Sequence, residues 1–371
     1  MGELKKTKRL ANIELLRIVS MLMVVSLHYL SRGGVYDAAK PFSFTFVTTC
    51  IWDGFSVICL NIYMLISGYV LAESGFKYKR LVDMVIQVFT YSFGFYVLMV
   101  LFGQASFDPK GLLNAFFPIL TSQYWFASVY VGLYLLTPFI NKAIHTLTKK
   151  QHLTLCILLV LMFSLYLPAK VLGQTGYGIA WMVTMYIVGA YLRMHYKPGV
   201  KLKAKHIFMW LIPTAMLPLS RFAVLILGNI LDKDLNVYST WFYKNNSVLT
   251  VCAAVAFFII FLHIQVKNVR AQKSITFFGP LTFGVYLVHN HPTLRTLIWD
   301  VANAPSYADT FYFVFLGIIT IVVIFLLSAT VEFVRVELYN RLMRNRLYRL
   351  CDKVEQKLRG QYNPESATQK N

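Results

Sequence analysis

The chain has 371 residues, of which 57% are hydrophobic and only 14% are charged, and its mean hydropathy is +0.57. This composition excludes a soluble globular protein, because too few polar side chains remain to cover a surface in water. The net charge of +20 would suit a nucleic-acid-binding protein, but the lysines and arginines form short clusters between apolar runs, which argues against that class as well.

Apolar runs long enough to cross a hydrocarbon layer of about 30 Å recur along the whole chain. The first run follows basic residues as a signal peptide would, but it contains charged residues and lacks a convincing cleavage site, so we expect a retained span. The fold class is therefore an all-α integral membrane bundle of about ten transmembrane helices. The predicted spans are 13–32, 51–72, 82–103, 119–141, 153–169, 177–193, 207–227, 247–265, 278–298 and 310–334.

The loops between these spans alternate in charge. The tails and the even-numbered loops contain 27 lysines and arginines, whereas the odd-numbered loops contain seven. Basic residues concentrate on the cytoplasmic side of membrane proteins, and a missed or invented span would have mixed the two counts. The pattern therefore predicts that both the N-terminus and the C-terminus lie in the cytoplasm.

Two regions follow from this topology: one transmembrane domain at residues 1–334, and a cytoplasmic tail at residues 335–371. From Val334 to Arg359 apolar and basic residues alternate, which suits an amphipathic helix lying on an anionic inner leaflet. After Gly360 we expect the tail to be disordered.

The chain contains five cysteines, and no two of them are spaced as CxxC or CxxxC. Most lie within or beside apolar runs, where cysteine behaves as a small hydrophobic residue. We therefore expect neither a disulfide framework nor a metal site. The cysteines are Cys50, Cys59, Cys156, Cys252 and Cys351.

The first predicted span contains three ionisable residues, Glu14, Arg17 and His28. Charged groups inside a membrane are expensive and are usually functional. Arg17 and His28 are eleven residues apart, which places them on nearly the same face of a helix and about 16 Å apart along its axis. Glu14 precedes Arg17 by about one turn and can pair with it. With the N-terminus inside, Arg17 lies near the cytoplasmic end and His28 in the outer half.

These residue types suit acyl transfer from a phosphorylated thioester carrier. An imidazole can take a proton from a hydroxyl group that attacks a carbonyl, or can carry the acyl group transiently, and an arginine fork can bind phosphate. Structural alternatives remain open at this point. Arg17 could be a topology anchor whose side chain reaches the inner surface, and His28 could be a hydrogen-bonded core histidine.

Several motifs along the chain occur in the order typical of one family of membrane enzymes, and together they resemble the acyltransferase-3 family. They are Glu14-x-x-Arg17 with His28 eleven residues later, Met64-Leu-Ile-Ser-Gly-Tyr-Val-Leu71 with Lys79-Arg80 after it, Tyr124-Trp125-Phe126 followed by Tyr134 and Pro138, and Phe278-Gly-Pro-Leu-Thr-Phe-Gly-Val-Tyr-Leu-Val-His289.

The resemblance implies a ten-helix bundle that takes acyl-CoA, often acetyl-CoA, from the cytoplasm and acylates lipopolysaccharide, capsule, peptidoglycan or another glycan outside. It also implies essential roles for Arg17 and His28, a multi-pass location in a bacterial inner (plasma) membrane and no tightly bound cofactor. Two positions depart from the family pattern. Glu14 stands where aspartate is common and Thr282 where serine is common, and both keep the functional group.

Further candidate residues each have a functional and a structural interpretation. Ser67 with Gly68 suits close helix packing, or its hydroxyl group faces the acyl path. Trp125 suits the membrane interface, or it stacks against a sugar ring. Arg221 lies at a similar depth to Asp53, so it either pairs with that carboxylate or binds the acceptor. The candidate substrate-binding residues are Ser67, Trp125, Arg221, Tyr286 and His289.

A transporter or flippase is the main alternative function, with the intramembrane cations as a substrate or proton path, but no inverted repeat is evident in the sequence. A scaffold or receptor is a third possibility, which requires these charges to be structural. The chain also lacks the HExxH, GxSxG, P-loop and Rossmann fingerprints. We therefore favour a membrane acyltransferase whose partners are acyl-CoA, a glycan and membrane lipid, and not nucleic acid.

Overall fold

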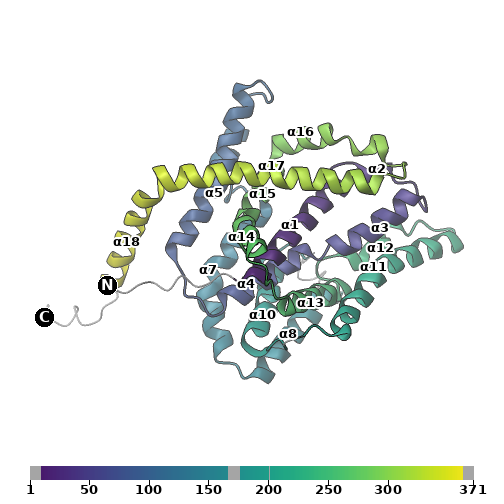
Figure 1. Ribbon diagram of the computed structural model, residues 1–371, viewed down its shortest axis with the longest axis horizontal. Coiled ribbons are helices and arrows are strands. Elements are labelled where there is room, and N and C mark those ends of the chain that lie inside the picture. Colours follow the sequence, from purple (N-terminus) through teal and green to yellow (C-terminus); the bar gives the residue numbers. More distant parts are fainter. Residues whose placement is uncertain (1–9, 166–175, 200, 362–371) are drawn as a thin grey trace.

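The computed structural model describes residues 10–165, 176–199 and 201–361, and every regular element in these ranges is a helix (Figure 1). In chain order the elements are α1 (Ala11–Ser31), α2 (Val35–Ala38), α3 (Phe44–Ser56), α4 (Cys59–Leu71), α5 (Tyr78–Leu101), α6 (Pro109–Phe116), α7 (Trp125–His145), α8 (Lys149–Ser164), α10 (Ile179–His195), α11 (Ala204–Ile230), α12 (Asn236–Ser239), η1 (Trp241–Tyr243), α13 (Val248–His263), α14 (Val269–Phe278), η2 (Gly279–Leu281), α15 (Thr282–His289), α16 (Pro292–Ala302), η3 (Ala304–Tyr307), α17 (Phe313–Leu342) and α18 (Arg344–Gln361).

Seven helical segments within the described ranges are long and apolar enough to cross a membrane, and each overlaps a predicted span. Two other predicted spans correspond to α8 and α10, which have 16 and 17 residues and are slightly shorter than a typical crossing helix. The membrane-spanning, all-helical class is therefore confirmed, whereas the count of ten and the cytoplasmic termini remain predictions. The seven segments are Ala11–Ser31, Phe44–Leu71, Tyr78–Leu101, Trp125–His145, Ala204–Ile230, Asn236–His263 and Phe313–Leu342.

The ninth predicted span is not one continuous helix. α14 ends at Phe278, the turn η2 contains Pro280, and α15 then runs for only eight residues before α16 begins at Pro292. Proline has no backbone N–H to donate and its ring clashes with the preceding turn, so it is tolerated at the start of a helix and breaks the interior. As a result α15 is a short helical piece packed on α1, α5 and α17.

The C-terminal helices run across residue 334, where the sequence places the boundary between the transmembrane domain and the tail, and that boundary stays a prediction. α17 continues through residue 334 to Leu342, and α18 then bends away from it (Figure 1). The hydroxyl groups of Tyr339 and Tyr348 both donate to Asp83 of α5, each at 2.6 Å. The tail therefore begins as an extension of the last span and is fastened to α5. Disorder is predicted after Gly360. Of those residues, the described ranges include only Gln361, the last residue of α18, and residues 362–371 lie outside them.

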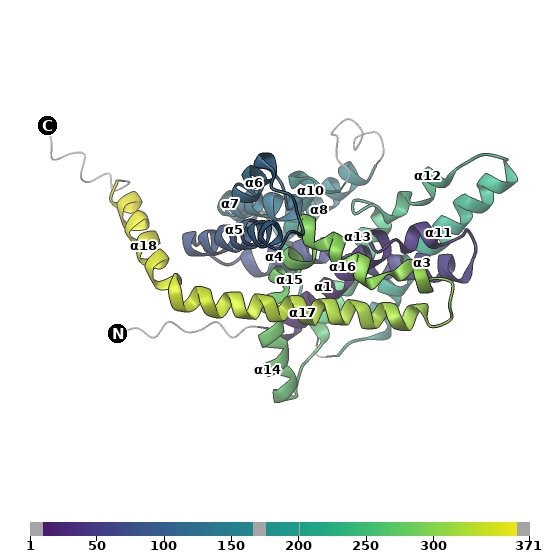
Figure 2. The same cartoon turned by 90° about the horizontal axis from the view of Figure 1, so that it is seen from above.

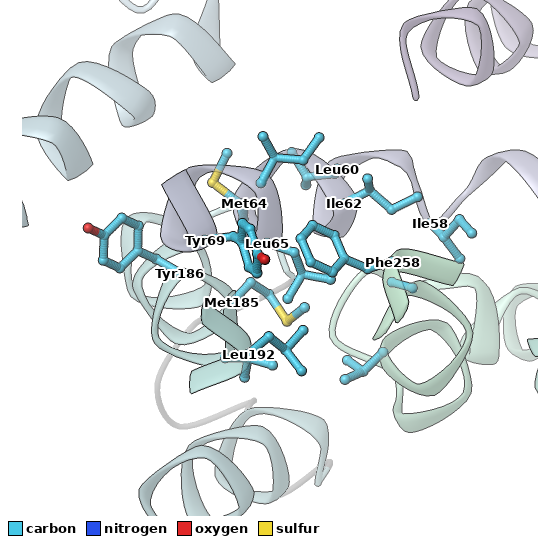
Figure 3. Close-up of a cluster of buried hydrophobic side chains, with 14 of the residues drawn as sticks. Ile58, Leu60, Ile62, Met64, Leu65, Tyr69, Met185, Tyr186, Leu192 and Phe258 are labelled. Carbon is cyan, nitrogen blue, oxygen red and sulfur yellow. The ribbon is translucent and has the colours of Figure 1, made fainter. Parts of the chain in front are cut away.

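The centre of the bundle is formed by α4, α10 and α13. Leu65, Met185 and Phe258 from these three helices pack together in the close-up of Figure 3. Gly68 lies directly against the backbone of Tyr186, and a side chain there would collide with α10. Small residues let helices approach closely in membranes, so Gly68 has the packing role that the sequence left open for the Ser67–Gly68 pair.

The periphery is formed in part by α17, which runs along one side of the bundle in the view of Figure 2. Its outward side chains include Phe315, Ile318 and Leu327, all of them exposed in the protein. Such a row of exposed large apolar residues would be unfavourable in water and is expected where a helix faces lipid tails.

Candidate functional site

The first helix lies in the interior of the bundle, where it packs against α3, α4, α13, α14, α15 and α17. Apolar side chains on more than one of its faces are buried, among them Leu16, Val25 and Leu30. The polar side chains of α1 from Asn12 to Tyr29 are therefore at least partly enclosed by protein. Because polar groups inside a membrane are costly, they need partners on the neighbouring helices.

A polar contact near the C-terminal end of α1 joins two histidines that are 261 residues apart in the chain. The Nδ1 atom of His28 lies 2.9 Å from Nε2 of His289 at the end of α15. The ring centroids are 5.0 Å apart, and His289 is completely buried. The other ring nitrogen of His289, Nδ1, lies 2.5 Å from the backbone carbonyl oxygen of Val285. The structure thus brings together two of the predicted site residues.

This chain of contacts determines which nitrogen of His28 is free when both rings are neutral. The carbonyl oxygen of Val285 can only accept, so Nδ1 of His289 carries a proton and donates it. Nε2 of His289 is then a lone-pair acceptor, and His28 must donate to it from Nδ1. Nε2 of His28 therefore has no proton, and its lone pair can accept one. His28 is thus arranged like a catalytic base, and His289 is the group that orients it.

Aromatic rings surround the histidine pair. Tyr286 lies one turn before His289, and its ring centroid is 5.5 Å from that of Phe126 and 6.2 Å from that of Tyr124. Tyr286 and Tyr124 are both buried. Next to His289, Asn290 accepts a hydrogen bond from the guanidinium group of Arg32, the residue that follows α1. The site therefore combines an aromatic wall with a cation at one end of α1.

The other end of α1 carries the predicted ion pair. Nη1 of Arg17 lies 3.2 Å from the carboxylate of Glu14, which is only 5% exposed. Glu14 packs directly against Gly279 in the turn η2, where any side chain would collide with the carboxylate. The hydroxyl group of Tyr63 donates to the backbone carbonyl oxygen of Arg17 at 3.0 Å. The ion pair is thus held between the first helix, α4 and the interrupted segment.

The two ends of α1 are connected by aromatic side chains. The ring of Tyr63, which contacts Arg17, lies 6.2 Å from that of Phe126. Phe126 in turn contacts Tyr286, whose ring is 6.4 Å from that of His289. A row of aromatic rings in mutual contact therefore extends from Tyr63, beside the ion pair, to the histidine pair.

Two of the predicted substrate contacts have structural partners. The hydroxyl group of Ser67 donates to the backbone of Tyr63 at 2.8 Å and lies 3.3 Å from the hydroxyl group of Tyr130. Trp125 begins α7, and its ring packs against Phe126 and Tyr177, with centroid distances of 5.9 and 5.2 Å. Ser67 therefore lies near the aromatic row, and Trp125 borders it.

Arg221 lies apart from the histidine pair. Its guanidinium group sits 5.0 Å above the ring of Phe46, so it contacts α3, on which α11 packs. Asp53 is buried nearby and hydrogen-bonds with Tyr36, and it interacts electrostatically with Arg221. Among the ion pairs of the described residues there is none between Arg221 and Asp53.

The sequence of this chain matches a known protein family over most of its length. A family model for an acyltransferase domain matches residues 10–329. The chain belongs to the acyltransferase-3 family. Comparisons with curated proteins and with solved structures give no match. The matched range contains His28, His289 and the ion pair of Arg17 and Glu14, so the acyltransferase-3 domain includes the whole site described above.

One buried group of the acyltransferase-3 bundle was missed from the sequence. Glu332 of α17 is only 2% exposed and forms a two-pronged ion pair with Arg335, at 2.8 and 2.7 Å. Its carboxylate also accepts hydrogen bonds from Tyr91 at 2.7 Å and from Gln87 at 3.0 Å, both on α5. The signal that could have identified it is a carboxylate within the tenth predicted span.

Replacing Glu332 with alanine is expected to destabilise the protein by about 3–5 kcal/mol, because the guanidinium group of Arg335, whose side chain is only 14% exposed, would lose its partner. Thermal unfolding of the purified protein in detergent measures the effect. Glu337→Ala is the matched control, since its 3.6 Å pair with Arg341 is exposed and contributes about 0.5 kcal/mol or less. Equal stability of the two variants would contradict a structural role for Glu332.

Proposed function

We propose that this acyltransferase-3 protein moves an acyl group, most simply acetyl, from cytoplasmic acyl-CoA to a hydroxyl group of an envelope glycan. The proposal places the N-terminal end of α1 on the cytoplasmic side of a bacterial inner membrane and His28 in the outer half. The observation that carries it is the hydrogen bond between His28 and His289, because it leaves Nε2 of His28 as an oriented base.

The proposed chemical step is direct transfer of the acyl group from the thioester to the acceptor hydroxyl. Nε2 of His28 takes the proton of the acceptor hydroxyl while the hydroxyl oxygen attacks the carbonyl carbon of the thioester. A C–O bond forms and the C–S bond breaks, and the departing thiolate takes the proton from His28. His289 accepts the hydrogen bond from Nδ1 of His28 throughout, and so stabilises the imidazolium formed in between.

In this proposal Arg17 binds the acyl-CoA donor. It lies eleven residues before His28, about 16 Å away along α1, and coenzyme A carries its thioester on a long pantetheine arm that can span such a distance. A guanidinium fork suits the phosphates of coenzyme A, and Glu14 holds that fork in place at 3.2 Å.

Arg17→Ala is expected to raise the KM for acyl-CoA by about 10- to 100-fold, the value of one charged hydrogen bond, with a much smaller change in kcat. Steady-state kinetics at varied donor concentration separate the two parameters. Arg270→Ala on α14 removes an exposed cation as a control and is expected to change neither. A loss of kcat at an unchanged KM would contradict donor binding by Arg17.

The direct experiment measures free thiol released from acetyl-CoA by the purified protein in lipid nanodiscs, with and without a crude envelope glycan. Release that the glycan stimulates, together with appearance of the acetyl group on the glycan, supports the proposal. Absence of release across acetyl, propionyl and longer acyl donors rejects it and favours a transporter, for which flux across proteoliposomes is the next measurement.

A further inference from the structure

The interrupted segment between α14 and α16 contacts two buried carboxylates, one on α1 and one on α17. Glu14 of α1 lies against Gly279 in the turn η2, and Glu332 of α17 lies against Gly284 in α15. The two glutamates are only 5% and 2% exposed. At either glycine, even the methyl group of an alanine would overlap atoms of the glutamate side chain. The segment is therefore in direct contact with acidic side chains on both of these helices.

The short helix α15 depends on its neighbours for its position. It has only eight residues, and Pro280 before it and Pro292 after it interrupt the continuous helix that would otherwise keep it in line with α14 and α16. The long helices on which it packs are α1, α5 and α17. Since His289 is the last residue of α15, any displacement of this helix moves the ring that contacts His28.

The carboxylate of Glu332 is firmly held. Arg335 donates to its two oxygens at 2.8 and 2.7 Å, and Tyr91 and Gln87 of α5 donate to it at 2.7 and 3.0 Å. The oxygen that accepts from Tyr91, Oε2, is one of the atoms that a side chain at position 284 would meet. Hydrogen bonds to a buried charge are strong, so the carboxylate cannot easily swing aside. It therefore limits how closely α15 can approach α17.

Gly284 and His289 face different sides of α15. Five residues correspond to about 140° around a helix, so the glycine faces α17 while the histidine faces α1. The short helix thus lies between a fixed carboxylate on one side and His28 on the other. Contact on the first side sets the separation on the second, where the two histidine nitrogens are 2.9 Å apart.

We propose that Glu332 is a positioning residue for acyl transfer. Its contact with Gly284 holds α15 at the distance from α1 at which the histidine pair forms. The effect on catalysis rests on the proposed function, whereas the effect on the histidine pair does not. The same contact explains why position 284 is a glycine, because only a residue without Cβ lets the helix backbone lie directly against the carboxylate.

The experiment compares Gly284→Ala with Gly94→Ala in the purified full chain in nanodiscs. Gly94 lies on α5, and a methyl group there would have open space within 4 Å, so it is the matched control. With acetyl-CoA and the crude envelope glycan, Gly284→Ala is expected to lower kcat about tenfold or more and to leave the KM for acetyl-CoA within about threefold. Gly94→Ala is expected to change neither.

Nuclear magnetic resonance of protein with nitrogen-labelled histidine reports the tautomer of His28, whose signals are assigned by their absence in His28→Ala. In the wild type and in Gly94→Ala we expect one neutral tautomer, protonated on Nδ1, because His289 accepts from that nitrogen. In Gly284→Ala we expect a mixture of tautomers, since the displaced ring of His289 no longer selects one. A merely structural role of the glycine would not change this signature.

A background without the carboxylate tests whether the effect passes through Glu332. The paired replacement Glu332→Ala/Arg335→Met removes it without leaving an unpaired guanidinium group. The three atoms nearest to a methyl group at position 284 all belong to Glu332, so in this background Gly284→Ala is expected to change kcat by less than about twofold. Tyr91→Phe, which removes one hydrogen bond to the carboxylate and little volume, is expected to remain folded and to lower kcat about three- to tenfold at unchanged KM.

Wild-type kcat and a single His28 tautomer in Gly284→Ala overturn the inference. A loss of kcat that persists when Gly284→Ala is made in the Glu332→Ala/Arg335→Met background overturns it too. If Gly284→Ala does not fold, Tyr91→Phe decides, and unchanged kcat and tautomer in that variant reject the positioning role. If the wild-type protein releases no thiol from any donor, the proposed function fails, and the resonance measurement alone decides whether the carboxylate positions the histidine pair.

Discussion

His28→Ala is expected to lower the rate of acyl transfer by about 10³-fold or more, while the protein still reaches the membrane in normal amount. The variant loses the lone pair that takes the proton of the attacking hydroxyl, and general-base catalysis contributes about 10²- to 10⁴-fold. Single-turnover transfer from acetyl-CoA, measured with wild-type and variant protein at equal concentration, gives the ratio directly.

The control is a buried histidine on a helix that does not contribute to the site. His152 of α8 is completely buried and contacts the backbone carbonyl oxygen of Ile187 at 3.2 Å. His152→Ala is expected to lower the unfolding temperature and to leave transfer within about threefold of wild type. Full transfer by His28→Ala would contradict the assignment of His28 as the catalytic base, even though the chain belongs to this family.

His289→Ala is expected to lower transfer by about 10²-fold, because the ring of His28 would lose the acceptor that fixes its tautomer and orientation. The effect is expected mainly in kcat, since His289 does not itself take the substrate proton in the proposed step. Steady-state kinetics with saturating donor and acceptor measure it.

His289→Gln distinguishes positioning from simple packing. A glutamine carbonyl oxygen can accept from Nδ1 of His28, so this variant is expected to recover at least tenfold of the activity that alanine loses. A structural contribution alone would make both variants lose activity in proportion to their stability. Equal kcat values for His289→Ala and His289→Gln at equal stability would reject the positioning role.

The sequence identified both members of the histidine pair but not their contact. His28 was identified because an ionisable residue inside a span is rarely incidental, and His289 because it closes a family motif. Their hydrogen bond joins positions 261 residues apart and depends on how α15 lies beside α1, which no local pattern describes. The free Nε2 of His28 could be deduced only once the carbonyl oxygen of Val285 was placed.

Other features were misjudged for identifiable reasons. Hydropathy over residues 278–298 resembles that of a span, although Pro280 and Pro292 interrupt the helix, because an average over residues does not register a missing backbone donor. Glu332 was overlooked because its partners on α5 lie some 240 residues earlier in the chain.

The long separations between partners also bear on how the protein is made. Helix α1 is synthesised before α13 and α15. Until those helices have been made, His28 cannot contact His289, and the side-chain amide of Asn12 cannot donate to the carbonyl oxygen of Phe261, at 3.1 Å in the folded protein. Until those segments have been synthesised, several polar side chains of α1 lack their hydrogen-bond partners inside the membrane. We therefore expect membrane quality-control proteases to treat the nascent chain as incomplete until α15, which ends at residue 289 of 371, has been inserted, and to degrade chains truncated before α15.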